Sequence, residues 1–278
     1  MNDDTRERAY GRVEQSRADD EVARHAEEIA VKGFTILPGV FDPSALAQWR
    51  SAIDRVYQQQ ESEFGRAALE EMHEQDVCRA PLLYDFRFVE LATPARVLEL
   101  VRHFLGDWFI LNLQNAVINR PALRHHQSAW HRDLPHQNFV ISRPLAINAL
   151  IAIDGFSEET GGTQVLPFSH RSERLPSDAY IRGHLQTVAA EAGSVIVFDS
   201  MLYHRAGANA SGAVRRAVNL LYTAPIIKQQ YDLPRALGER PELSPELQRL
   251  LGYTSQVPLD DRSWRRARAL RFKAANPA

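Results

Sequence analysis

The stretch Trp130-His131-Arg132-Asp133 decides how the rest of the chain is interpreted. Side chains in a β-strand alternate between its two faces, so His131 and Asp133 can point at the same place. An imidazole and a carboxylate directed at one place form most of a metal site that has three protein ligands. A histidine taken alone is more often a surface or core side chain, so this pattern needs support from elsewhere in the chain.

His204 supplies that support, because it ends an apolar, strand-like run that begins at Val195. Two histidines and one carboxylate make up the facial triad that holds non-haem Fe(II) on one side and leaves the other side open for a co-substrate and O2. We therefore predict that His131, Asp133 and His204 are the metal ligands and form the catalytic centre.

Further patterns follow the His-x-Asp pair in a fixed order. They are Gly161-Gly-Thr-Gln-Val-Leu-Pro-Phe-Ser-His170, then His204, and then Arg215 eleven residues later. The segment Lys32-Gly-Phe-Thr-Ile-Leu-Pro-Gly-Val40 precedes them all. This ordered set resembles the phytanoyl-CoA dioxygenase family of Fe(II)/2-oxoglutarate-dependent oxygenases, and the resemblance extends over about residues 30 to 270.

The resemblance implies a mainly β fold with flanking helices, built on a double-stranded β-helix, the cupin-like jelly roll. Such a core brings the ends of distant strands to one mouth, so His204 can meet His131 across 73 residues. It also implies Fe(II), 2-oxoglutarate as co-substrate and O2, with hydroxylation or another oxidation of a small molecule and release of succinate and CO2. Halogenating relatives replace the triad carboxylate by Gly or Ala, so the presence of Asp133 favours hydroxylation.

Arg215 is the candidate for binding the distal carboxylate of 2-oxoglutarate. Arginine suits this task because its planar guanidinium donates two parallel hydrogen bonds to a carboxylate. The family carries its anchoring arginine at this spacing, and strand alternation would direct the adjacent Arg216 to the opposite face. In the alternative interpretation, both arginines lie in solvent at the edge of the sheet.

Two amides and several histidines need a functional and a structural interpretation side by side. Relatives place co-substrate or substrate contacts on the strand of Gln114, and Asn148 interrupts the apolar run 145–153, so both are candidate co-substrate ligands or structural amides. His170 is interpreted as structural. Three histidines flank the triad segment as exposed residues or substrate contacts, namely His125, His126 and His136.

Composition excludes several kinds of partner. The 278 residues are 44% hydrophobic and carry a formal net charge of -2, which lacks the basic footprint of nucleic-acid binding. The single cysteine, Cys78, rules out an internal disulfide and a cysteine-based metal site. The N-terminus lacks the apolar core of a signal peptide, and no apolar run of about 18 residues occurs. We expect a soluble, cytoplasmic protein that acts on a small molecule, without nucleic-acid or membrane partners; its oligomeric state stays open.

The patterns divide the chain into a mobile N-terminal segment, 1–19, and a single oxygenase domain, 20–278. Its jelly-roll core is expected at about 107–225 and a helical C-terminal segment at about 226–278, whose last, basic helix docks through Trp264, Ala267 or Leu270. Helices are predicted at 20–32, from Asp42 onward and at 94–104, covering one face of the sheet. Predicted strands are 34–37, 107–120, 128–131, 145–153, 163–166, 186–189, 194–198 and 214–222.

Other enzyme classes lack their signature motifs here. The chain contains no Gly-x-Gly-x-x-Gly after a strand, no Walker loop, no His-Glu-x-x-His and no Gly-x-Ser-x-Gly. The remaining alternative is a non-catalytic or isomerase-type jelly-roll protein that binds a metal and a small ligand. Neither the fold nor the triad selects the primary substrate.

Overall fold

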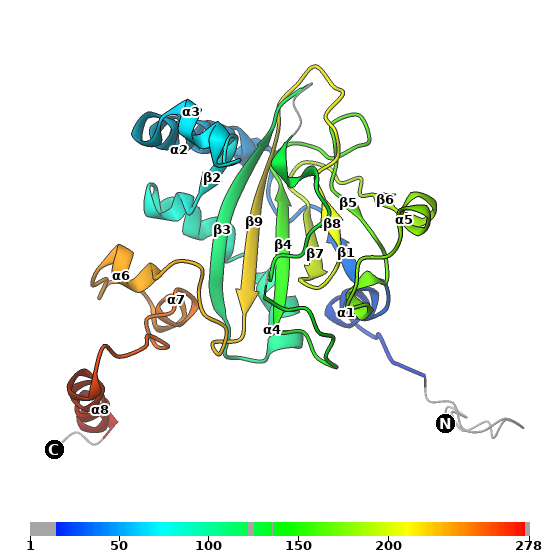
Figure 1. The fold of residues 1–278 in the computed structure, drawn as a ribbon. Coiled ribbons are helices and arrows are strands. Elements are labelled where there is room, and N and C mark those ends of the chain that lie inside the picture. Colours follow the sequence, from blue (N-terminus) through cyan, green and yellow to red (C-terminus); the bar gives the residue numbers. More distant parts are fainter. Residues whose placement is uncertain (1–14, 122–124, 135, 276–278) are drawn as a thin grey trace, which may run out of the picture.

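The structure is a computed structural model that describes residues 15–121, 125–134 and 136–275. Most of the predicted mobile segment lies outside these residues. Two antiparallel sheets face each other, a six-stranded sheet in the order β1-β7-β4-β9-β3-β2 and a three-stranded sheet in the order β6-β5-β8 (Figure 1). The strands are β1 (Phe34–Leu37), β2 (Val77–Arg79), β3 (Ile110–Asn119), β4 (Ala146–Ala152), β5 (Gln164–Val165), β6 (Gln186–Thr187), β7 (Val195–Asp199), β8 (His204–Arg205) and β9 (Arg215–Thr223).

Helices cover the outer face of the six-stranded sheet (Figure 1). The α-helices are α1 (Glu21–Lys32), α2 (Leu46–Phe64), α3 (Arg66–Glu71), α4 (Ala95–Leu105), α5 (Asp178–His184), α6 (Leu233–Leu237), α7 (Pro245–Leu250) and α8 (Asp261–Ala275). Short 3-10 helices are η1 (Pro43–Ala45), η2 (Pro81–Leu83), η3 (Phe86–Ala92), η4 (His126–Ser128) and η5 (Ser169–Arg171).

Local sequence sets the ends of the first helix. The Asp20 carboxylate accepts a hydrogen bond from the backbone N–H of Ala23, which satisfies a free donor of the first turn. Gly33 ends the helix with a φ of 97°, a left-handed conformation that a residue without a Cβ adopts freely. The chain then enters β1 and pairs with β7, so this helix packs beside the sheet.

Alternation along the strands divides the apolar residues into two layers. One set of side chains packs against the helices, including Ile147, Ala149 and Ile151 from β4. The opposite set packs between the two sheets, including Leu150 from β4 and Phe198 from β7. The sheet is therefore buried on both faces, and the space between the sheets is where polar side chains can be sheltered from water.

The predicted jelly-roll core and the helical cover are confirmed, although more residues lie in helices than in strands. The expected strand 128–131 is absent, and in its place η4 is followed by a single bridge between His131 and His204. The predicted docking of the last helix is wrong, because Trp264 is 45% and Leu270 69% exposed. Among the helices of the described ranges, none combines the length and apolar character needed to cross a lipid bilayer.

Candidate metal centre

The three predicted metal ligands meet between the two sheets. His131 Nε2 lies 3.7 Å and His204 Nε2 3.6 Å from Asp133 Oδ1, and the ligand atoms of all three residues lie within 4.8 Å of one another. The His204 and Asp133 side chains are 8% and 12% exposed, and that of His131 is 31% exposed. The site is therefore a sheltered pocket that opens to solvent on the side of His131.

Backbone pairing places the two imidazoles next to each other. The N–H of His131 donates to His204 O at 3.0 Å, and the N–H of His204 donates to His131 O at 3.1 Å. Each Nδ1 donates to a carbonyl two residues earlier, that of Ala129 at 2.8 Å and that of Leu202 at 3.0 Å. Because a carbonyl only accepts, the proton sits on Nδ1 and each Nε2 keeps its lone pair for a metal.

Asp133 is held as a carboxylate. Burial raises its pKa, but His204, His131 and the Asn219 amide outweigh burial, so its pKa lies well below the usual range. Burial lowers the pKa of His204, and the neighbouring Asp133 carboxylate reverses this effect and raises it. Two imidazoles around one carboxylate thus form a ready anionic donor set for a divalent cation.

Arg132, between the two ligands of the His-x-Asp pair, points away from the centre. Its guanidinium donates to the carbonyl oxygens of Met201 at 2.8 Å, Glu173 at 3.0 Å and Ser169 at 3.2 Å, and to that of Ser172. It also stacks on the Tyr203 ring, 3.8 Å from its centroid. One side chain therefore joins the segment of His131 and Asp133 to the segment that leads to His204.

The positions of Arg215 and Arg216 agree with the predicted alternation. Arg215 is 2% exposed, lines the cavity of the triad, donates to Gly161 O at 2.8 Å and stacks on Phe156, whereas its Nε has no partner among the described residues. Burial lowers its pKa to about 10, so it stays charged at neutral pH. Arg216 lies on the helix side and pairs with Asp54 of α2 and with Asp154.

The prediction that Gln114 contacts the co-substrate is wrong. Gln114 lies on the helix-facing side of β3, opposite Leu220, and donates to Phe88 O at 2.8 Å. On this strand, Val117 is the residue that lines the cavity. The face that Gln114 shares with Ala116 and Ile118 was assigned to the cavity although it packs against the helices, because β3 is buried throughout and polarity does not distinguish its two faces.

Asn148 lies on the cavity side of β4, but its amide contacts Asp133, a predicted metal ligand. Asn148 Nδ2 donates to Asp133 Oδ2 at 2.5 Å, so the predicted contact with the co-substrate is replaced by a contact with the carboxylate. Asn219 donates to the same oxygen at 2.7 Å and was not predicted as a site residue. The available signal was alternation, because Asn219 lies on the same face of its strand as Arg215.

Among the described side chains, those of the other histidines considered as site residues lie outside the cluster of ligands. His170 is buried, as expected for a structural residue, with Nε2 3.3 Å from Ala30 O. His125 is buried, with Nδ1 accepting from the N–H of Gln127, whereas His136 is exposed. His126 lies in η4, and its side chain is outside the described set.

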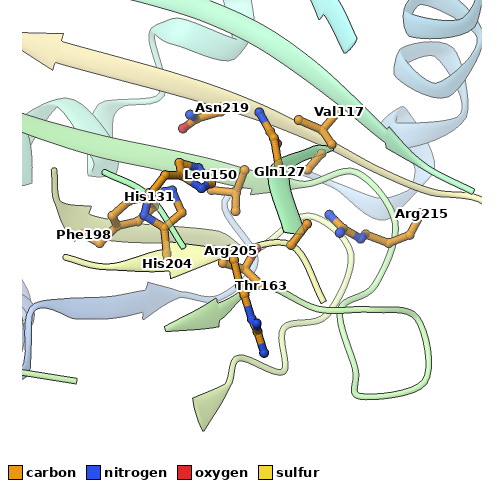
Figure 2. A pocket seen from close by; sticks show the side chains of 12 residues that line it. Val117, Gln127, His131, Leu150, Thr163, Phe198, His204, Arg205, Arg215 and Asn219 are labelled. Carbon is orange, nitrogen blue, oxygen red and sulfur yellow. The ribbon is translucent and has the colours of Figure 1, made fainter. Parts of the chain in front are cut away.

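A cavity between the sheets connects the triad with Arg215. Figure 2 shows His131 and His204 at one end and Arg215 at the other. Apolar side chains such as Leu150 and Phe198 line much of it, together with the polar Gln127, Thr163 and Asn219. Phe198 packs edge-on against the His204 ring, with centroids 4.8 Å apart. The cavity thus combines predicted metal ligands, the cationic side chain of Arg215 and a largely apolar lining.

Comparison with known proteins fits this geometry. The family model for phytanoyl-CoA dioxygenase (PhyH) matches residues 29–217, which include the triad and both arginines. The chain belongs to the phytanoyl-CoA dioxygenase family. The resemblance found in the ordered motifs is thereby confirmed.

Relatives of this family member include proteins of bacteria and fungi. An uncharacterized protein of Mycobacterium tuberculosis is 36% identical over 235 residues, which cover 81% of this chain and 84% of that protein. The iron/alpha-ketoglutarate-dependent dioxygenase penM of Penicillium thymicola is 30% identical over 168 residues, 56% of this chain and 52% of that protein. Dioxygenase af480 of Aspergillus fumigatus is 30% identical over 169 residues, with the same coverage of 56% and 52%.

Solved structures share the fold of this phytanoyl-CoA dioxygenase family member. EctD from S. alaskensis, crystallised with 2-oxoglutarate and 5-hydroxyectoine, has a TM-score of 0.60 at 20% identity and covers 76% of this chain and 79% of its own. The non-heme alpha ketoglutarate dependent epimerase SnoN from nogalamycin biosynthesis has a TM-score of 0.56 at 20% identity, covering 73% and 83%. At these identities the similarity shows the fold.

The residues present fit the two cofactors of this class. Two imidazole nitrogens and one carboxylate oxygen are the donor set of the facial triad of Fe(II) oxygenases. The unpaired Nε of the buried Arg215 leaves an open donor in the same cavity, which suits the free carboxylate of a dicarboxylic oxo acid. The triad therefore suits Fe(II), and Arg215 suits 2-oxoglutarate.

Proposed function

We propose that the protein is an Fe(II)- and 2-oxoglutarate-dependent dioxygenase that hydroxylates a small-molecule substrate and releases succinate and CO2. The observation that carries this proposal is one cavity lined by the triad histidines His131 and His204 and by Arg215, a buried cation with an open donor. A metal site alone would serve many functions. A metal site with a sheltered carboxylate anchor suits a co-substrate that is both chelating and dianionic.

Each residue has a definite task in this proposal. His131 Nε2, Asp133 Oδ1 and His204 Nε2 hold the iron, and Arg215 binds the distal carboxylate of 2-oxoglutarate. When bound, iron and 2-oxoglutarate supply the electrons that activate O2, with loss of CO2. Leu150, Phe198 and Ala217 line the cavity and limit the access of water. Asp133 occupies the ligand position that a halide would need, so transfer of oxygen is favoured.

Removing either histidine tests the metal site. His131→Ala and His204→Ala are expected to abolish Fe-dependent succinate formation with little loss of stability, because neither imidazole is part of the apolar core clusters. His136→Ala, an exposed histidine of the neighbouring loop, is the matched control and should behave as wild type. Near-wild-type succinate formation by either triad variant would contradict the assignment.

The reaction type is tested on the product. Succinate formation is followed against a metabolite library, and the product of the best substrate is analysed by mass in the presence of abundant chloride. We expect a gain of one oxygen. A chlorinated product would contradict the role of Asp133, and a product of unchanged mass would indicate epimerisation or isomerisation.

A colour test separates the oxygenase from a binding protein of the same fold. Without O2, Fe(II) plus 2-oxoglutarate should give a weak visible charge-transfer band with the wild-type protein. A protein that binds metal but does not chelate the oxo acid stays colourless, which would support the non-catalytic alternative.

A further inference from the structure

The outer oxygen of Asp133 is held by two amides from neighbouring strands. Asn219 Nδ2 of β9 donates to Asp133 Oδ2 at 2.7 Å, and Asn148 Nδ2 of β4 donates to the same oxygen at 2.5 Å. Asn148 Nδ2 also lies 3.1 Å from Asn219 Oδ1, so the three side chains form a closed network. Because an ionised carboxylate only accepts, both amide groups must turn their NH2 toward it.

We propose that Asn148 and Asn219 are positioning residues that make Asp133 a one-oxygen metal ligand. This inference rests on the proposed metal site. Two charge-assisted hydrogen bonds in a sheltered site hold Oδ2, and Oδ1 is the oxygen that faces the Nε2 atoms of His131 and His204. The pair therefore decides which oxygen of the carboxylate reaches the metal and fixes its direction.

The cost of Asn148 to the fold argues for such a role. Asn148 is fully buried in an otherwise apolar strand, and its Oδ1 has no partner among the described residues. An apolar side chain of similar shape would avoid this unsatisfied acceptor. The unpaired Oδ1 lowers the stability of the fold. Among the described contacts of this amide, only its hydrogen bonds to Asp133 and Asn219 offset that loss.

One-oxygen coordination matters for the number of open positions. Two histidines and one carboxylate oxygen would take three positions of a six-coordinate metal. The remaining three suffice for a chelating 2-oxo acid and for O2. A carboxylate that bound through both oxygens would leave only two positions for these three donor atoms, so by holding Oδ2 the two asparagines would keep a position free for O2.

Metal titration of the protein without 2-oxoglutarate tests the proposal. Asn148→Leu and Asn219→Ala should each raise the dissociation constant for Mn(II) or Co(II) about tenfold to a hundredfold, the usual effect of removing a group that orients a ligand. The thermal midpoint of metal-free Asn148→Leu should be unchanged or higher, because its unsatisfied acceptor is gone. Gln114→Leu is the matched control, since Gln114 is a buried amide of the same sheet, also with an unpaired oxygen, without contact to Asp133.

The outcomes separate this inference from the proposed function. Wild-type metal affinity in both variants would overturn the role of the asparagines and leave the metal site intact. A lower thermal midpoint of the metal-free variants at unchanged affinity would show that the amides are structural and would also overturn it. If the wild-type protein did not bind one metal ion per chain, the proposed function would be wrong.

Discussion

Two adjacent arginines of β9 point to opposite faces of the sheet, one to the cavity and one to the covering helices. Arg215 faces the cavity without an ion pair to a described carboxylate, whereas Arg216 forms ion pairs with Asp54 and Asp154 on the helix side. Alternation along β9 imposes this division. The face of each arginine was predictable from the residues that share it. Val218, Leu220 and Tyr222, on the face of Arg216, are bulkier than Ala217 and Asn219, on the face of Arg215.

Replacing Arg215 should weaken the binding of 2-oxoglutarate. Loss of a charge partner in a sheltered pocket costs several kcal/mol, and each 1.4 kcal/mol corresponds to about tenfold in affinity. Arg215→Ala is therefore expected to raise the 2-oxoglutarate concentration for half-maximal rate about a hundredfold or more. Arg216→Ala, the control, should lower the free energy of unfolding and leave that concentration nearly unchanged; the opposite ranking in a titration would contradict the assignment.

Asp199 makes stability depend on pH. Burial raises the pKa of its carboxyl to about 6, although it accepts a hydrogen bond from the N–H of Met201. The folded state therefore binds this proton more tightly than the unfolded state, and the free energy of unfolding falls as pH rises from about 4 to about 6. Asp199→Asn keeps the acceptor and removes the charge.

The Asp199→Asn variant should be more stable than wild type at pH 8. The gain is at most about 3 kcal/mol, from a pKa difference of roughly two units at 1.36 kcal/mol each. The two proteins should converge below about pH 4, where wild-type Asp199 is protonated in both states. Denaturant unfolding at pH 4 and pH 8 measures this, and an equal difference at both values would show that the charge is not the cause.

At the scale of elements, the strands with a clear contrast between faces were predictable. The runs 145–153 and 214–222 correspond to β4 and β9, and the predicted faces of β9 are correct. β3 was found as a strand, but burial of all ten residues removed the contrast that identifies its faces, which is why Gln114 was misplaced. The three-residue strand β2 is too short to show a periodicity, and it was missed.

The segment of the triad itself shows what alternation cannot supply. His131 and Asp133 meet as predicted, yet only His131 is in a bridge, and Asp133 lies in a bend. Contacts of Arg132 with distant carbonyl oxygens, and of Asp133 with Asn148 and Asn219, hold this irregular segment in place. Such long-range side-chain contacts leave no local pattern in a sequence.

Arg132 should stabilise the connection between the two ligand-bearing segments. Arg132→Met removes the donor of hydrogen bonds to several backbone carbonyls; a hydrogen bond to a charged group contributes about 1.5–3 kcal/mol net, and less where the side chain is partly exposed, as that of Arg132 is. We expect a loss on the order of 3 kcal/mol in the free energy of unfolding, with weaker metal binding. Arg171→Met is the control, because Arg171 is exposed and its guanidinium donates to the single carbonyl of Ala30. Equal losses in both variants would contradict this role of Arg132.

At the scale of the whole molecule, the C-terminal segment contributes in two different ways. Leu243, Leu250 and Leu251 belong to the core on the helical face of the sheet, so the part up to α7 completes the fold. Beyond it, α8 projects from the body (Figure 1), with Leu270 69% and Phe272 70% exposed. The basic helix is therefore a solvated extension of the domain in this structure.

Two truncations should separate these contributions. In the segment 257–278, the described side chains, up to residue 272, bury little surface. Removal of this segment is therefore expected to change the thermal midpoint by less than about 2 °C, given that 1 kcal/mol corresponds to about 2–4 °C in a protein of this size. Removing residues 243–278 also deletes three buried leucines, each contributing about 1.5–3 kcal/mol, and should lower the midpoint strongly or prevent folding. Succinate formation should survive the shorter deletion. A fall of more than about 5 °C on removal of 257–278 would show that α8 packs against the body or against a second copy of the chain in solution.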